Sequence, residues 1–222
     1  MIRPCSLALL LAAVLAFSTE SASALTIRFD GTVSSEINFG PPSGLVGEAW
    51  SATITYDENH GDELPAIPEI GLYNLGLIAY DVTVGANTWT YDSIPFLRVD
   101  HFPASNDFLQ YEAIVFGPDI GTGDTTPRIG VFLNDTSATA HSSDALLVSA
   151  PTLADYNQLT AQLDFFDSVG DLSRLVLTID SAITVVPEPS TALLFGLGLI
   201  GIAYRKRRSI GSSCSVVGRS DN

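Results

Sequence analysis

Two loops of the chain carry carboxylate side chains at spacings that could bind a hard divalent cation. The first contains Asp57, Glu58 and Asp62, and the second runs from Asp119 to Asp124 with glycines between them. Calcium takes about six to eight oxygen ligands from flexible acidic loops, and glycine frees backbone carbonyls to join them. Neither loop has the spacing of an EF-hand or of a calcium-binding repeat. These five acids are candidate ligands for a structural calcium ion, solvated acidic loops are the alternative, and no other cofactor is expected.

Three histidines offer a second kind of chemistry, because His60, His101 and His141 accompany many serines and aspartates. A nucleophile needs a histidine base and an orienting acid beside it, and such triads assemble in space rather than in sequence. The chain has no G-x-S-x-G turn. Each histidine is expected in a loop, where a surface role is the commoner one. No catalytic residue is therefore assigned, and a secreted hydrolase stays an alternative.

The segment 186–208 has three parts in a fixed order. It begins with two prolines around a glutamate, which exclude a helix there: Pro187, Glu188 and Pro189. Residues 190–204 follow without a charge, and as a helix they would measure roughly 22 Å against a hydrocarbon core of about 30 Å. Four basic residues close the segment: Arg205, Lys206, Arg207 and Arg208. The order predicts a short transmembrane helix in the inner membrane, with residues 209–222 as a cytoplasmic tail.

This three-part order resembles the PEP-CTERM sorting signal of Gram-negative bacteria. The resemblance rests on the Pro-Glu-Pro, the glycine-rich apolar run 192–203 and the basic cluster, and covers about a tenth of the chain. It implies an exosortase as partner, cleavage near the Pro-Glu-Pro, and transfer to the cell envelope or extracellular matrix, where exopolysaccharide is a candidate partner. An ordinary C-terminal membrane anchor is the alternative. Family members usually end soon after the basic cluster, whereas here 14 residues follow.

The N-terminus carries a second targeting signal. A basic residue precedes an apolar stretch over 6–17, and Ala22 and Ala24 flank a serine in an A-x-A cleavage site. The apolar stretch is too short to span a membrane. We therefore expect a signal peptide over residues 1–24 and a mature chain that begins at Leu25.

The intervening residues, 25–185, are strongly acidic. They hold 22 Asp and Glu against four Arg and no Lys, a formal charge of −18. Such a domain repels nucleic acid and anionic lipid surfaces, so no nucleic-acid partner is expected. Neither cysteine lies in this region, so it forms no disulfide and depends on hydrophobic burial for its stability.

Residues 25–185 alternate between apolar and polar side chains, which is typical of strands with one buried face. The pattern predicts these strands: 25–33, 50–56, 80–84, 89–91, 109–116, 128–133, 161–165 and 175–185. The run 109–116 is apolar on both parities and is expected at the centre of a sheet. Gly85 and Ala86 predict a hairpin turn. About eight to ten short strands in one domain favour an all-β fold, an antiparallel β-sandwich or jelly roll.

The positions of the aromatic side chains distinguish a structural domain from a carbohydrate-binding module. A carbohydrate-binding module would present aromatic rings on one exposed face of a sheet. Five share the parity of aliphatic neighbours and are expected in the core: Trp50, Tyr56, Tyr80, Trp89 and Tyr91. Four others are candidates for exposure: Tyr73, Phe96, Phe102 and Tyr156. We therefore expect an exported cell-envelope or matrix protein with a non-catalytic structural or interaction role. A carbohydrate-binding module is the second interpretation, and a secreted hydrolase is the third.

Overall fold

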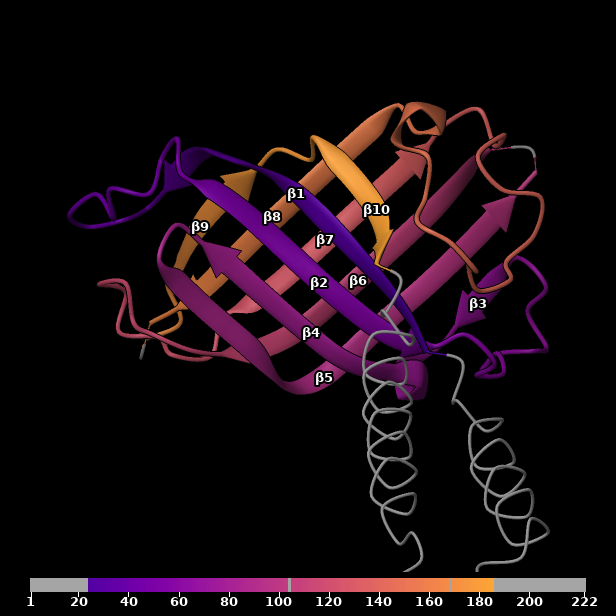
Figure 1. Cartoon of the computed structure of the whole chain (residues 1–222), viewed down its shortest axis with the longest axis horizontal. Helices are drawn as coiled ribbons and strands as arrows, with labels where there is room; N and C mark the ends of the chain where they lie inside the picture. The colour runs from indigo at the N-terminus through magenta and orange to yellow at the C-terminus, as the bar shows by residue number, and fades with distance from the viewer. Residues whose placement is uncertain (1–23, 104, 168, 186–222) are drawn as a thin grey trace, which may run out of the picture. The chain divides into compact units, whose positions relative to one another are not determined.

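The structure, a computed structural model, describes residues 24–103, 105–167 and 169–185, which belong to one compact unit ending at Val185. In these residues the regular elements are strands and two single-turn 3-10 helices (Figure 1). The strands are β1 (Ala24–Ile37), β2 (Ala49–Asp57), β3 (Ile70–Leu72), β4 (Leu77–Val84), β5 (Asn87–Phe102), β6 (Asn106–Phe116), β7 (Arg128–Asp135), β8 (Gln158–Phe166), β9 (Leu172–Leu177) and β10 (Ser181–Val185). The helices are η1 (Asn74–Gly76) and η2 (Leu153–Asp155).

Every strand pairing is antiparallel, so the prediction of an antiparallel all-β domain is confirmed. The sandwich arrangement is corrected, because the strands close into an eight-stranded barrel in the order β1-β2-β4-β5-β6-β7-β8-β9, with β9 pairing back onto β1. Strand β10 adds to β1, and β3 adds to β5. Among the described strands, β3 and β10 are left pairing on one side only.

Two long strands make this closure by serving both layers of the barrel. Strand β1 pairs with β2 over residues 24–32 and with β9 over 33–37. Strand β5 pairs with β4 at residues 87–89 and with β6 over 90–102. The register of each strand shifts where it changes partner, and such bulges bend a strand and increase its twist.

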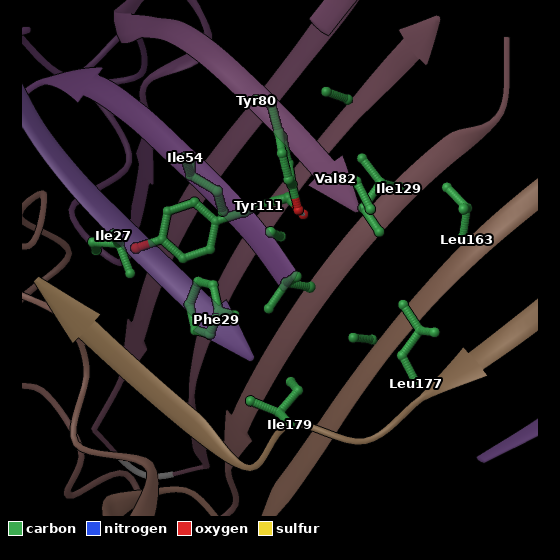
Figure 2. Packing of buried hydrophobic residues seen from close by; sticks show 14 of the residues in the cluster. Ile27, Phe29, Ile54, Tyr80, Val82, Tyr111, Ile129, Leu163, Leu177 and Ile179 are labelled. Carbon is green, nitrogen blue, oxygen red and sulfur yellow. The ribbon is translucent and has the colours of Figure 1, made fainter. Parts of the chain in front are cut away.

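The core lies between the β1-β2-β4 layer and the β6-β7-β8-β9 layer. Figure 2 shows side chains from the two layers pointing toward one another, among them Ile27, Phe29 and Ile54 from one and Ile129 and Leu163 from the other. All five are fully buried. Burying one such side chain contributes about 1.5–3 kcal/mol, so a core of this kind stabilises the barrel without a disulfide.

The predicted strands are found, with two corrections. Strand β6 alternates strictly between buried and half-buried positions instead of being buried on both faces, because its outer face borders solvent. The predicted long final strand is two strands, β9 and β10, separated at residues 178–180. The interruption lies beside the bend of β1, where Trp50 Nε1 donates to the Thr178 carbonyl at 2.6 Å. Ile183 consequently points outward and is half exposed.

The aromatic predictions are partly confirmed. Trp50, Tyr56, Tyr80 and Trp89 are buried, and Tyr91 is half-buried. Two residues predicted as candidates for exposure are buried instead: Tyr73 and Tyr156. The Tyr73 hydroxyl donates to the Asp144 carbonyl, in the connection between β7 and β8, at 3.0 Å. Tyr156 lies in that same connection, where its ring packs against His141. The other two candidates, Phe96 and Phe102, are half-buried.

The targeting segments fall largely outside the described residues. This holds for residues 1–23 of the predicted signal peptide and for the predicted sorting signal with its helix, basic cluster and tail. Ala24, the last residue before the predicted cleavage point, is the first residue of β1 and pairs with Asp57. Among the described residues, no helix is long and apolar enough to cross a membrane.

Candidate functional site

The first acidic loop follows β2, and its aspartate side chains accept hydrogen bonds from nearby backbone N–H groups. Asp57 accepts a hydrogen bond from the Asn59 N–H at 2.9 Å, and Glu58 lies in the same turn. Asp62 accepts from the N–H groups of Leu64 at 2.8 Å and Leu72 at 2.9 Å, which ties the loop to β3. Asp57 and Asp62 therefore satisfy backbone donors that the loop would otherwise leave without partners.

The second acidic loop connects β6 and β7 and is built in the same way. One oxygen of Asp119 accepts from the N–H groups of Gly121, Thr122 and Gly123 at 2.8, 2.8 and 2.9 Å. These bonds, the one from Gly123 foremost, lower the pKa of the Asp119 carboxyl. Asp124 is buried and accepts from the Phe166 N–H at 2.9 Å, which joins the loop to β8.

The structure thus gives the predicted calcium ligands a role in turn geometry. Within the described part of the chain, no group of three or more His, Cys, Asp or Glu side chains is placed to hold a metal ion. A calcium ion would compete with the backbone donors for the same oxygens. Calcium binding by these loops stays a prediction of the sequence.

Two histidines expected apart in loops meet at one end of the barrel, around the fully buried Asp107. His101 lies in β5, not in a loop, and its Nδ1 is 2.6 Å from Asp107 Oδ1. The other oxygen of Asp107 accepts from the backbone N–H of His141 at 2.8 Å. The hydroxyl of Tyr156 lies 3.1 Å from His141 Nδ1. The third histidine, His60, lies in a loop as expected.

Burial dominates the electrostatics of this histidine cluster. Desolvation lowers the pKa of His141, and the Asp107 carboxylate opposes that shift. The ring is therefore neutral at pH 7. Its Nε2 is buried and has no hydrogen-bond partner among the described residues. A pocket of about 160 Å³ borders the cluster and is lined in part by His141, Asp155 and Tyr156.

The hydrogen bonds of the cluster hold the connection between β7 and β8 in place. Among the described residues, no hydrogen bond joins a histidine ring to a Ser or Thr hydroxyl. Nearby Asp135 is also buried and accepts from the backbone of Thr139 and Ala140. Both aspartates hold the connection between β7 and β8 against the barrel end. Sequence reasoning missed the cluster because its members are far apart in the chain.

A second feature lies on the outside of the barrel. We call the outward residues of β5 from Phe96 onward, with those of β6, β7, β8 and β9, the β5–β9 outer face. Phe108 and Phe132 stack there with ring centroids 6.3 Å apart. Sequence reasoning overlooked this pair, although each ring has the parity opposite to its buried aliphatic neighbours, which was the available signal.

Comparison with known proteins adds the C-terminal element. Residues 185–208 match the PEP-CTERM protein-sorting motif, which covers the Pro-Glu-Pro, the apolar run and the basic cluster of the sequence. No curated protein and no solved structure matches the chain. The motif indicates an exported protein with a C-terminal sorting signal handled by an exosortase. It begins at Val185, the last residue of β10.

Proposed function

We propose that this chain is an exosortase substrate whose barrel reaches the cell envelope or extracellular matrix after cleavage near residues 187–189. The observation that carries the proposal is the match of residues 185–208 to the sorting motif. A cut near the Pro-Glu-Pro falls after Val185, so every described residue of the barrel, β10 included, stays in the product.

Residues 190–204 hold the chain in the inner membrane until that cut. Their lack of charge and the basic cluster at 205–208 support this role, because four cations favour the cytoplasmic side. The barrel then lies outside the cytoplasm, consistent with a signal peptide over residues 1–24. The tail 209–222 stays inside.

The barrel itself has a structural or interaction role and catalyses no reaction. Support comes from the histidine cluster, in which one oxygen of Asp107 contacts the His101 ring and the other accepts the backbone N–H of His141. The acids of the predicted calcium loops are likewise engaged with backbone donors. These groups stabilise loops, and the domain needs no cofactor for that purpose.

Replacing Pro187 and Pro189 with alanine tests the sorting role. The double variant should accumulate at full length in the inner membrane, because the recognition element is lost while the membrane segment is intact. Cell fractionation followed by immunoblotting measures the distribution. The matched control replaces Pro41 and Pro42, an exposed pair in the loop between β1 and β2, and should be released normally. Release of the Pro187/Pro189 variant at the wild-type level would refute exosortase sorting.

Carbohydrate binding is the second candidate function for the barrel, and one observation favours it. The stacked pair Phe108 and Phe132 lies on an outer sheet face, where aromatic rings have no core to fill.

A further inference from the structure

The β5–β9 outer face is electrically balanced within a strongly acidic domain. Three of the four arginines of residues 25–185 lie on it, each paired with an acid of the same face. The nitrogen–oxygen distances are 2.5 Å for Arg98–Asp100, 3.1 Å for Arg128–Glu112 and 2.6 Å for Arg174–Asp164. The excess of acidic over basic residues therefore lies outside these three pairs.

Two phenyl rings form a platform on β6 and β7 of this face. Phe108 of β6 pairs with Asn134 of β7, and Phe132 of β7 pairs with Gln110 of β6, so the two rings are diagonal neighbours across the ladder. Their planes differ by 22°. Diagonal positions on adjacent strands are within reach of aromatic side chains, and each ring is only half-buried.

Gly130 fixes the height of the platform. A Cβ at this position would lie 2.5 Å from Cζ of Phe132, so the ring lies directly over the glycine backbone. With any other residue at 130 the ring would have to lift away from the sheet. The glycine therefore makes the aromatic surface low and flat.

Side-chain amides and carboxylates surround the platform. Gln110 donates to Glu112 at 3.0 Å, and Asn134 donates to Gln158 at 3.0 Å. Gln162 donates to Asp164 at 3.3 Å. Each amide carries two N–H donors and two acceptor lone pairs, so these bonds orient the groups and leave capacity for a ligand.

We propose that the β5–β9 outer face binds a neutral polysaccharide chain. Flat aromatic rings pack against the C–H faces of sugar rings, and the oriented amides and carboxylates pair with the hydroxyls at their edges. An anionic polymer would be repelled by the charge of the domain. A protein partner would need a wider apolar patch, because a stable protein interface buries roughly 1,200–2,000 Å² in total. The inference rests on the proposed export, which brings the barrel to where such polymers occur.

Binding of the purified full-length chain to defined polysaccharides tests this inference. The probes are soluble β-glucan, dextran and amorphous cellulose as neutral polymers, and alginate as the anionic one. Wild-type protein should bind at least one neutral probe and bind alginate more weakly. Replacing both Phe108 and Phe132 with alanine should weaken binding by about tenfold or more, because two aromatic contacts are lost.

Ile78→Ala is the control. Ile78 is an exposed apolar residue on β4, outside the β5–β9 outer face. Its affinity should stay within about twofold of wild type, well below the tenfold loss expected for the platform pair. Thermal melting confirms that each variant is folded, and Gly130→Ala supplies a test without loss of an aromatic group. The added methyl lifts the ring of Phe132, so binding should weaken while the melting temperature changes little.

Three results would overturn the inference: no binding to any neutral probe, equal binding by the Phe108/Phe132 variant, or tighter binding to alginate. If neutral probes fail and the double variant instead changes the sedimentation behaviour, the face is a contact between copies of the chain. These measurements use purified protein, so their failure leaves the sorting proposal intact. Failure of the Pro187/Pro189 experiment likewise leaves the binding result intact.

Discussion

The two outer faces of the barrel differ in kind although both are solvent-facing halves of alternating strands. On the β1-β2-β4 layer several outward positions hold threonine or serine: Thr26, Thr32, Ser51, Thr53, Thr55 and Thr83. Their hydroxyls pair across strands, with Thr26 and Thr55 at 3.0 Å. Every aromatic side chain of these three strands is buried. The β5–β9 outer face instead carries the stacked rings, the amides and three of the four arginine pairs.

An outward-facing position on a strand is therefore not always occupied by a polar residue. Threonine suits a solvent-facing strand because a β-branched side chain packs well on the pleated surface and bonds across the ladder. A phenyl ring in the same place gains nothing from water. As a cross-strand pair the two stacked rings contribute about 0.2–1 kcal/mol to the ladder, and in the proposed complex their open faces also contact a ligand.

The largest loss of stability is expected from Gly31, close to the point where β1 passes from one layer of the barrel to the other. A Cβ on Gly31 would clash with the Thr178 carbonyl oxygen and lie 2.7 Å from Trp50 Nε1. Gly31→Ala should therefore lower the free energy of unfolding by about 2–4 kcal/mol, through overpacking and a strained Trp50 hydrogen bond. Urea unfolding measures the change. Gly40→Ala, where a Cβ meets nothing within 4 Å, is the control. An unchanged midpoint for Gly31→Ala would show that the packing around Gly31 is not tight.

The next largest effect compares the stability lost when one ion pair is broken on each face. Asp164 is buried and receives two bonds from Arg174, at 2.6 and 2.8 Å. Asp164→Asn should cost about 1–2 kcal/mol, because it leaves a partly buried guanidinium without its carboxylate. Asp30→Asn removes the partner of the exposed Arg28 on the other face and should cost less than about 0.5 kcal/mol. Chemical denaturation of both variants checks this, and equal losses would remove the distinction between the faces.

Acid should first destabilise the connection between β7 and β8, which contains His141. Burial lowers the pKa of His141 from its ordinary 6.5, so the unfolded chain binds this proton more readily than the folded one. The histidine's contribution is complete above pH 6.5 and is lost as the pH falls toward the lowered value. Hydrogen exchange at pH 7 and pH 5 should show protection lost over 136–157 before β1 and β2. His141→Gln should flatten this dependence, and an unaltered profile would assign it to another group.

Calcium should have the smallest effect. Asp119 and Asp124 lie in a loop outside both faces, and their oxygens accept backbone N–H groups. Adding EDTA, or calcium in excess, should therefore shift the melting temperature by less than about 1 °C, since no binding free energy is linked to folding. Differential scanning calorimetry measures the shift. A calcium-dependent rise abolished by Asp119→Asn would instead establish the metal site that the sequence allows.

Much of the fold follows from the sequence, because alternation is a local property. It located β1, β2, β4 and β7 and put Trp50 and Trp89 in the core. Barrel closure could not be predicted in this way, since it depends on which partner a bulged strand takes after its bend. The interrupted final strand has the same cause.

The candidate sites show the limit more clearly. The sorting motif is contiguous, so its residue order alone identified it. The cluster around Asp107 joins His101 and His141 across a chain separation that no spacing rule anticipates. Phe108 and Phe132 form a pair only through the register of β6 with β7, which the sequence leaves undetermined.

Export and C-terminal cleavage are tested most directly by the intact mass of the wild-type protein recovered from culture medium and from inner membranes. The released species should begin at Leu25 and end near residues 187–189, and the membrane species should still contain 190–208. Released protein that retains the basic cluster, or uncut protein free in the cytosol, would contradict this prediction.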